Sequence, residues 1–221
     1  MQASLIHTER MRRFETAGLY LVTSQTLSAG RSTLDIIKMA LDAGVQLIQL
    51  REKDIAVREL AILAEKARAI TAQYNALLLI NDRIDVALAT GADGVHLGQE
   101  DLPVQHARRI APDMIIGAST HSEEEALRAQ EEDASYINIG PLFPTGTTKV
   151  AIAPLGIEGL KMISAVARIP FTVMGGIKAE HIPELLDSGA RTIALVTAVT
   201  AAPDPTAAAT ELLSLIRPAV S

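Results

Sequence analysis

The stretch LLLINDRIDVALATGADGVHL, from Leu77 to Leu97, contains one complete strand–helix–strand unit. An apolar run at Leu77–Ile80 is followed by a short helical pattern at Ile84–Thr90 and by a second apolar run at Gly94–Leu97. Gly91 ends the helix, because glycine readily adopts the left-handed conformation found after helices. Buried strands joined by a helix are typical of parallel sheets.

The same alternation extends in both directions along the chain. Strands are expected at Leu19–Thr23, Leu47–Leu50, Leu77–Ile80, Gly94–Leu97, Met114–Ala118, Tyr136–Ile139, Phe171–Val173 and Thr192–Val196. Helices are expected at Thr33–Ala43, Val57–Tyr74, Ile84–Thr90, Val104–Ile110, Ser122–Glu132, Gly156–Val166, Ala179–Ser188 and Pro205–Ile216. Eight such pairs predict an α/β fold, a single (β/α)8 TIM barrel. An open doubly wound sheet would normally stop after about five or six strands.

The composition agrees with one barrel domain. The chain has 221 residues, 48% of them hydrophobic, which suits one substantial core and is short for two ordinary domains. Residues 1–18 are expected to form an N-terminal extension, as an extra helix or a loose tail, and residues 19–221 the catalytic barrel. Cysteine is absent, which excludes disulfides and thiolate metal sites and suits the reducing cytoplasm.

Charge and hydropathy limit the expected partners. The net charge of −6 argues against a general nucleic-acid surface. No apolar run is long enough to cross a membrane, and residues 1–18 lack the apolar core of a secretory signal. We therefore expect a cytoplasmic protein that binds small molecules, with a homo-oligomer left open. An anionic substrate would need a local concentration of cations, since the global field opposes its binding.

Two cations and an amide lie at the end of the second expected strand. TIM barrels carry their active sites at the C-terminal ends of the strands. Alternation along the strand places Gln49, Arg51 and Lys53 on the inner face and Leu50 on the outer face. An arginine fork beside an ammonium group suits a phosphate or a pyrophosphate. The alternative is a structural salt-bridge network with a barrel carboxylate.

Carboxylates follow the third and fourth expected strands. Asn81 and Asp82 end the third strand, and Asp101 lies in the loop after the fourth. Each aspartate alone is best interpreted as a helix cap. Brought together at about 4 Å, however, two carboxylates repel by roughly 4 kcal/mol at an effective dielectric of about 20, and a hard divalent cation relieves that repulsion. Oxygen ligands completed by phosphate indicate Mg²⁺.

Three further loops carry candidate ligands. Ser119 would either hydrogen-bond a phosphate or cap the next helix, whereas His121 is more often a structural partner than a catalytic group. The loop Gly140–Lys149 has three threonines beside a lysine, which favours a lid over a bound phosphate. Met174–Ile177 and Val196–Thr197 follow the last two strands, where barrels commonly bind phosphate through backbone N–H groups.

These motifs resemble those of the thiamine-phosphate synthase (thiamine-phosphate pyrophosphorylase) family. The matching stretches are QLREKD from Gln49, INDRIDVALATGADGVHLGQEDLP from Ile80, IGASTHSEEEA from Ile116, GPLFPTGTTK from Gly140 and VMGGI from Val173. They occur in the family's order, from the end of the second expected strand to the loop after the seventh, and GVHLGQEDLP is particularly specific.

The resemblance implies a transferase of thiamine biosynthesis. It would join 4-amino-5-hydroxymethyl-2-methylpyrimidine diphosphate to 4-methyl-5-(2-hydroxyethyl)thiazole phosphate by a dissociative, Mg²⁺-assisted substitution that releases pyrophosphate. The implied ligands of the pyrimidine diphosphate are Gln49, Arg51, Lys53, Asn81, Ser119 and Lys149, of which Arg51, Lys53, Ser119 and Lys149 would be catalytic. The implied ligands of Mg²⁺ are Asp82 and Asp101, and those of the thiazole phosphate are Thr145, Thr147, Gly176, Val196 and Thr197.

One loop departs from the family pattern, and two other functions stay open. The family reads Pro-Thr-any-Thr-Lys, but here Thr148 follows and the lysine comes one place later as Lys149. Either Lys149 serves the pyrophosphate or that contact is weaker. A thiazole tautomerase of the same superfamily would use His121, and a non-catalytic protein would only sense thiamine-pathway ligands. Asp101 argues against the tautomerase, and the metal pair with both cations argues against the sensor.

Overall fold

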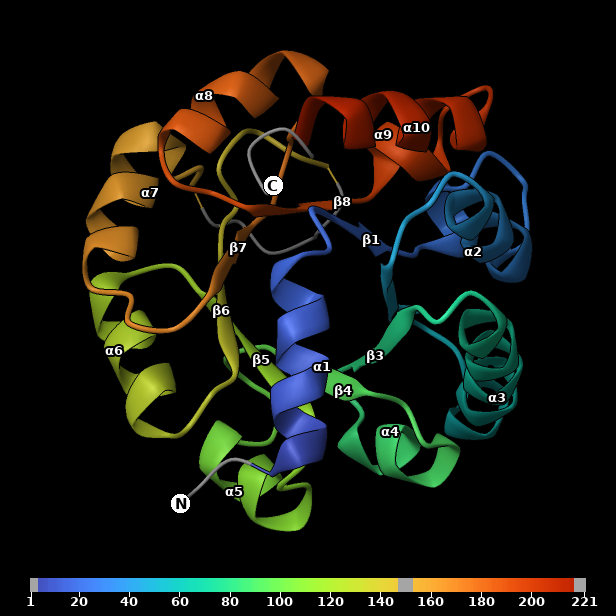
Figure 1. Cartoon of the computed structure of the whole chain (residues 1–221), viewed down its shortest axis with the longest axis horizontal. Coiled ribbons are helices and arrows are strands. Elements are labelled where there is room, and N and C mark those ends of the chain that lie inside the picture. The colour runs from blue at the N-terminus through green and yellow to red at the C-terminus, as the bar shows by residue number, and fades with distance from the viewer. Residues whose placement is uncertain (1–3, 147–152, 217–221) are drawn as a thin grey trace.

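The computed structural model describes residues 4–146 and 153–216 as a closed barrel of parallel strands surrounded by helices (Figure 1). The strands follow the chain order from β1 to β8, and β8 pairs with β1 through Leu19 and Ile193. This closure confirms the TIM barrel and excludes an open doubly wound sheet. Over the same residues, no helix has both the length and the apolar character needed to cross a bilayer.

The elements alternate as the sequence predicts. The strands are β1 Leu19–Val22, β2 Leu47–Leu50, β3 Leu77–Asn81, β4 Gly94–Leu97, β5 Ile115–Thr120, β6 Tyr136–Ile139, β7 Phe171–Val173 and β8 Thr192–Leu195. The α-helices are α1 Leu5–Glu15, α2 Thr33–Asp42, α3 Val57–Gln73, α4 Ile84–Thr90, α5 Val104–Ile110, α6 Glu123–Glu131, α7 Gly156–Ala165, α8 Ile182–Asp187, α9 Thr197–Thr200 and α10 Pro205–Ile216. Two short 3-10 segments are η1 Gln25–Leu27 and η2 Ala179–His181.

Two local features differ from the expectation. The fifth strand extends to Thr120, so Ser119 lies inside β5 and not after it. Tertiary pairing explains the longer strand, because Ser119 pairs with Asn138 of β6 and continues the β-ladder. The short helix α9, beginning at Thr197, was not expected from the sequence.

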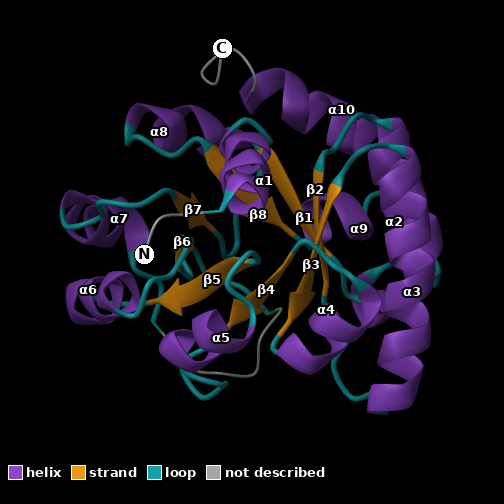
Figure 2. Ribbon diagram, turned by 60° about the horizontal axis from the view of Figure 1, so that its bottom comes forward, coloured by secondary structure: helices purple, strands orange, loops and turns teal. Residues whose placement is uncertain are grey.

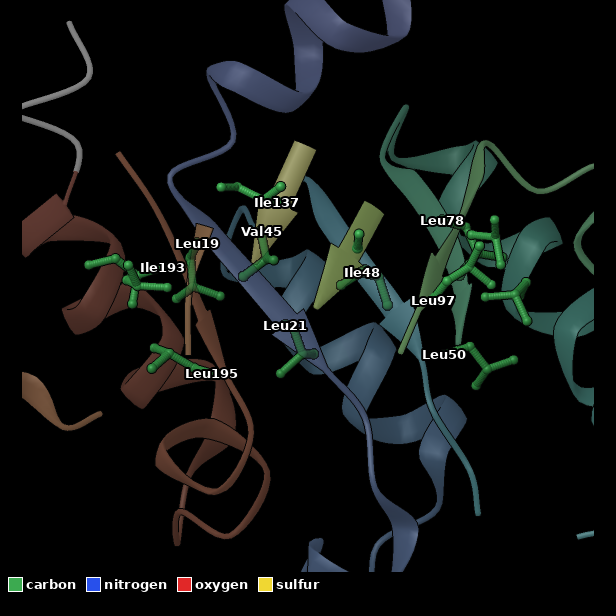
Figure 3. Close-up of a cluster of buried hydrophobic side chains, with 14 of the residues drawn as sticks. Leu19, Leu21, Val45, Ile48, Leu50, Leu78, Leu97, Ile137, Ile193 and Leu195 are labelled. Carbon is green, nitrogen blue, oxygen red and sulfur yellow. The ribbon is translucent and has the colours of Figure 1, made fainter. Parts of the chain in front are cut away.

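The two faces of the barrel bury different side chains. Outward-facing apolar residues, including Leu21, Ile48 and Leu195, pack beneath the helices (Figure 3). The inner face is more polar and contains the largest buried rings. Gly117 makes room for one of them, because a Cβ atom there would lie 2.1 Å from Cζ of Tyr136. The interior therefore depends on a large ring opposite a residue without a side chain.

Helix α1 lies across the N-terminal end of the barrel (Figures 1 and 2). Its Phe14 is 1% exposed and packs into the inner cluster. The ring centroid of Phe14 lies 4.4 Å from that of Tyr136 and 6.4 Å from that of Tyr20. Most of the expected N-terminal extension is thus a helix that closes the barrel floor, while its separation from a domain beginning at residue 19 stays a prediction.

A buried carboxylate fixes this helix to the strands. Asp93, which precedes β4, lies 3.4 Å from Nε of Arg10 and 3.0 Å from Nη1 of Arg68. The same carboxylate accepts a hydrogen bond from the backbone N–H of Leu78 at 2.9 Å. Arg10 also donates to the carbonyl of Asp113 at 2.9 Å. These polar contacts join α1 to the starts of three strands, at the end of the barrel opposite the expected site.

Candidate active site

Gln49, near the end of β2, and Arg51, directly after it, lie at the C-terminal mouth of the barrel. Gln49 is 3% exposed and points inward, where its Nε2 donates to Oη of Tyr20 at 2.6 Å. Arg51 is half-buried, and burial lowers the pKa of its guanidinium while the charges of Asp82 and Glu52 raise it. A guanidinium held in such a place gains from a further anion. The alternation of side chains along the strand therefore predicted correctly that Gln49 lies on the inner face of the barrel.

Glu52 organises the loop that carries Arg51, a role that the sequence did not reveal. Its carboxylate accepts hydrogen bonds from Oγ1 of Thr33 at 2.7 Å, from Oγ1 of Thr23 at 2.9 Å and from the backbone N–H of Gln25 at 2.9 Å. The backbone N–H of Arg51 in turn donates to Oγ1 of Thr23 at 3.0 Å. The conformation of this loop is thus set by one carboxylate bonded to the loop after β1.

Replacing Glu52 by glutamine should lower the free energy of unfolding by about 1–2 kcal/mol, because charge-assisted bonds become neutral and one acceptor is replaced by a donor. Chemical denaturation of both proteins measures this difference. Glu9→Gln is the matched control, since the exposed Glu9 pairs with the exposed Arg12 at 2.8 Å and its replacement should change stability little. An equally small effect of Glu52→Gln would contradict the organising role.

The two predicted metal ligands lie side by side. The carboxyl group of Asp82 is within hydrogen-bonding reach of the carboxylate of Asp101. Burial, together with this contact, raises the pKa of Asp82 to about 6, while the charges of Lys53 and Arg51 act in the opposite direction. Neighbouring strand ends therefore bring two carboxylates and two cations into one cluster.

The helix-cap interpretation is wrong for both aspartates. The residue at the N-cap of α4 is Arg83, and that at the N-cap of α5 is Pro103; neither makes a side-chain capping bond. Asp101 instead accepts a hydrogen bond from the backbone N–H of Gly98 at 2.6 Å, within its own loop. The physical reason is the loop geometry, which directs both carboxylates toward each other and away from the helix ends.

The backbone at Asp82 is held in an unusual conformation. Its φ of 61° is in the left-handed region, which aspartate adopts more readily than most residues. Its N–H donates to the carbonyl of His96 at 2.8 Å, so the end of β4 fixes the turn after β3. Backbone strain of this kind is concentrated at ligand sites and turns. The position of the carboxylate is therefore determined by two strands.

The oxygen donors at this cluster fit Mg²⁺. Within residues 4–146 and 153–216, no group of three or more His, Cys, Asp or Glu side chains could hold a metal ion. Mg²⁺ does not require such a cage, since it usually takes one or two carboxylates and completes its shell with water and substrate phosphates. Burial, and after it the neighbouring carboxylate of Asp101, raise the pKa of Asp82, and a bound cation would favour the ionised form of both groups.

Ser119 is bonded to a buried histidine and does not cap a helix. Its Oγ lies 3.0 Å from Nε2 of His96, whereas the N-cap of α6 is Ser122. Burial lowers the pKa of His96 to about 4, so its imidazole is neutral near pH 7. His96 was not predicted as a site residue, although its place in a strand between the apolar Val95 and Leu97 was a signal for an inward polar group.

His121 is engaged by a neighbouring helix. Its Nδ1 lies 2.8 Å from Oε2 of Glu125 in α6, and its backbone N–H donates to the same oxygen at 2.7 Å. This double contact agrees with the interpretation of His121 as a structural partner at the end of β5.

The loops after β6 and β7 are packed backbone to backbone. The N–H of Phe143 donates to the carbonyl of Gly175 at 2.9 Å. A Cβ atom on Gly176, whose φ is +65°, would lie 2.5 Å from the carbonyl oxygen of Pro144. The ring of Phe143 stacks on His181 with centroids 3.9 Å apart. These contacts bring Gly176 close to the threonine-rich loop.

The remaining predicted ligands divide into described and undescribed residues. Thr145 is half-buried beside this packed junction. Val196 precedes α9 and packs partly against the inner cluster, and Thr197 begins the helix, whose first N–H groups have no partners within the helix. Thr147 and Lys149 lie outside the described residues, and the contact of Lys149 with the pyrophosphate stays a prediction.

Comparisons with known proteins agree with this geometry. A sequence model described as thiamine monophosphate synthase matches residues 19–199. The chain is 47% identical over 186 residues to a thiamine-phosphate synthase of Chlorobium luteolum, covering 84% of this chain and 88% of that protein. It is 38% identical to one of Caldicellulosiruptor saccharolyticus, covering 91% of each.

A solved structure gives the same result. A thiamine phosphate pyrophosphorylase from Pyrococcus furiosus is 37% identical and superposes with a TM-score of 0.87, covering 95% of this chain and all of that one. The sequence match extends from the first strand to α9, and the structural match includes most of the rest. The resemblance drawn from the motifs is therefore confirmed, and the chain belongs to the thiamine monophosphate synthase family.

Proposed function

We propose that this protein is a thiamine-phosphate synthase that joins the pyrimidine diphosphate to the thiazole phosphate and releases pyrophosphate. The observation that carries the proposal is the paired Asp82 and Asp101 beside Arg51 and Lys53. A tautomerase that moves one proton has no use for two adjacent carboxylates and two cations at one mouth. A family member with this cluster is suited to a substrate with a diphosphate leaving group.

The pyrimidine diphosphate would bind over strands β2 to β5. Arg51 and Lys53 would contact the diphosphate, with Lys149 supplying a further cation from the loop after β6. Gln49, Asn81 and Ser119 would orient the substrate from the inner face. The proposed ligands of the pyrimidine diphosphate are therefore Gln49, Arg51, Lys53, Asn81, Ser119 and Lys149.

Asp82 and Asp101 would hold Mg²⁺, which supplies positive charge to the leaving diphosphate when it is bound. Arg51 and Lys53 stabilise the same negative charge as the pyrimidine methylene separates from its oxygen. The aminopyrimidine delocalises the positive charge that remains on the methylene, and the thiazole nitrogen then forms the new bond. No strong general base is needed, so catalysis rests on positioning and electrostatics.

The thiazole phosphate would bind over strands β6 to β8. The proposed ligands are Thr145, Thr147, Gly176, Val196 and Thr197. Backbone N–H groups at Gly176 and at the start of α9 suit a phosphate, as in other barrels. An anchor at this end would hold the thiazole nitrogen close to the reacting methylene, which lies over the opposite strands.

The cytoplasmic location, the absence of nucleic-acid partners and a homo-oligomeric state stay predictions. They are compatible with an enzyme of two small phosphorylated substrates, but each needs its own measurement.

The direct test is to mix the purified protein with both substrates and Mg²⁺ and to measure pyrophosphate and thiamine phosphate. Both products should form in equal amounts, and only when both substrates and a divalent cation are present. The control omits each substrate in turn. A tautomerase would convert the thiazole compound without the diphosphate, and a sensor would bind both compounds without releasing pyrophosphate; either result would overturn the proposal.

A further inference from the structure

Five polar side chains form a continuous hydrogen-bonded chain through the barrel interior. Nε2 of Gln49 lies 2.6 Å from Oη of Tyr20, which lies 3.0 Å from Oη of Tyr136. That hydroxyl lies 2.8 Å from Nδ1 of His96, whose Nε2 lies 3.0 Å from Oγ of Ser119. The chain begins and ends on two proposed ligands of the pyrimidine diphosphate, and its three inner members are buried.

The amide at one end gives the chain a direction. Nε2 of Gln49 can only donate, so Oη of Tyr20 accepts and must place its own hydrogen on Tyr136. The hydroxyl of Tyr136 then has its hydrogen left for Nδ1 of His96. With Nδ1 accepting, the ring proton lies on Nε2 and is donated to Oγ of Ser119.

With Nε2 of Gln49 facing Tyr20, the opposite direction would leave a buried donor unsatisfied. If Nδ1 of His96 carried the proton, Tyr136 would have to donate to Tyr20. Tyr20 would then accept from both sides, and its own hydrogen would have no acceptor among the described residues. Tyr20 is 1% exposed, so bulk solvent does not reach its hydroxyl to replace that acceptor. Leaving a buried hydroxyl without a partner is costly, and this favours the first direction.

The imidazole remains neutral in this environment. His96 is 5% exposed, and its two ring nitrogens face hydroxyl oxygens of Tyr136 and Ser119, neither of which is a carboxylate that would stabilise an imidazolium. The orientation of the imidazole ring is also fixed, because it stacks on the ring of Tyr136 with centroids 5.7 Å apart. A neutral imidazole has one donor and one acceptor nitrogen, so it transmits the direction of the chain.

We propose that Tyr136 is a positioning residue, which fixes the tautomer of His96 and thereby leaves the hydroxyl hydrogen of Ser119 free to donate to the pyrimidine diphosphate. The inference rests on the proposed function in one respect, namely that Ser119 binds this substrate. Because Ser119 already accepts from His96, its own hydrogen is directed toward the ligand as a donor. A donor is what a diphosphate oxygen or a pyrimidine nitrogen requires.

The arrangement also couples the two ends of the chain. If the amide of Gln49 turned its oxygen toward Tyr20, every hydrogen in the chain would reverse and Ser119 would donate to His96. A substrate group that fixes the orientation of Gln49 therefore also fixes Ser119 on the other side of the barrel. This direction of hydrogen bonding is transmitted by Tyr20, Tyr136 and His96, none of which would contact the diphosphate.

The test replaces Tyr136 by phenylalanine and measures both the tautomer and the kinetics. ¹⁵N NMR of histidine-labelled protein distinguishes protonated from unprotonated ring nitrogens, and the His96 signals are assigned by their loss in His96→Gln. We expect a single Nε2-protonated form in the native protein and a second tautomer in Tyr136→Phe. We also expect kcat/KM for the pyrimidine diphosphate to fall about tenfold, the value of one hydrogen bond to a charged ligand.

Two further variants separate positioning from a general structural effect. Tyr74→Phe removes the hydroxyl of a partly buried tyrosine, which donates to Asp42 outside the site, and should leave tautomer and kinetics unchanged. In a Ser119→Ala background, Tyr136→Phe should cause no further loss, because its effect acts through Ser119. A purely structural role would give additive losses in the double variant and an unchanged His96 tautomer.

The outcomes also separate this inference from the proposed function. An Nδ1-protonated His96 in the native protein, or unchanged His96 signals in Tyr136→Phe, would overturn the inference even if pyrophosphate is released normally. Absence of pyrophosphate release by the native protein would overturn the proposed function, while the tautomer measurement would still decide the direction of the chain.

Discussion

Replacing Asp101 by asparagine is expected to lower kcat/KM more than about a thousandfold and to make the metal-free protein more stable. The loss of activity follows from removing one of two proposed carboxylate ligands of Mg²⁺, which contributes several kcal/mol to charge stabilisation at about 1.4 kcal/mol per tenfold change in rate. The fold should survive, because an asparagine oxygen can still accept the hydrogen bond from Gly98 N–H.

The gain in stability follows from the raised pKa of Asp82. A carboxyl whose pKa is raised from 3.8 to about 6 on folding stabilises the folded state fully below pH ~4, and this contribution is lost as the pH rises through about 6. At pH 7 the ionised pair therefore destabilises the metal-free protein. Removing the charge of Asp101 should therefore raise the free energy of unfolding of the metal-free protein by about 1 kcal/mol, a value that allows for solvent screening at a partly exposed pair.

Thermal unfolding at pH 7 without Mg²⁺ should show the Asp101→Asn variant melting about 2–4 °C above the native protein, a difference that narrows toward pH 4. Added Mg²⁺ with a diphosphate should raise the melting temperature of the native protein only. Asp187→Asn, at an exposed aspartate of α8, is the control. Near-normal turnover of Asp101→Asn would exclude Asp101 as a ligand of Mg²⁺. An unchanged melting temperature would exclude a destabilising repulsion between the carboxylates of Asp82 and Asp101.

Gly176→Ala should lower kcat/KM for the thiazole phosphate about a hundredfold. The new Cβ atom would lie 2.5 Å from the carbonyl oxygen of Pro144 and 2.7 Å from that of Phe143, both rigid backbone atoms. The loop after β6 must therefore move away, taking Thr145 with it. Displacing a bound reactant by about 1 Å costs on the order of a hundredfold in rate.

A second glycine separates this clash from backbone strain. Gly91 has a φ of +63°, close to the +65° of Gly176, but a Cβ atom there would have no heavy atom within 4 Å. Gly91→Ala should thus cost about 1 kcal/mol of stability and leave the kinetics unchanged. Steady-state kinetics with each substrate varied in turn decides the matter. Equal effects of the two variants would show that the loop contact has no part in binding.

Much of the fold was predictable because the strands are short apolar runs with clear ends. Leu47–Leu50 and Phe171–Val173 were predicted with the bounds that they have in the structure. The fifth strand was too short in the prediction because its last pairs depend on β6, and that partner is not visible locally. The short helix α9 lacks a side-chain cap and so left no signal in the sequence.

The candidate site was predictable where residue type alone carries the chemistry. Arg51 and Asp82 were found because cations and carboxylates at strand ends suggest ligands, although the cap interpretation failed since local sequence does not reveal a left-handed turn. Tyr20 and Tyr136 were missed for the opposite reason. Each alone is an ordinary core residue, and only closure of the barrel brings their hydroxyl groups together across 116 positions of sequence.

The helix across the barrel floor has a consequence for the order of events during synthesis. Phe14 leaves the ribosome before Tyr136, against which its ring packs, and Arg10 leaves before Asp113, whose carbonyl accepts from its side chain. Helix α1 therefore cannot dock on the barrel until more than half of these 221 residues have emerged from the ribosome. Until then its apolar residues are available to chaperones, and docking of α1 marks a late stage of cotranslational folding.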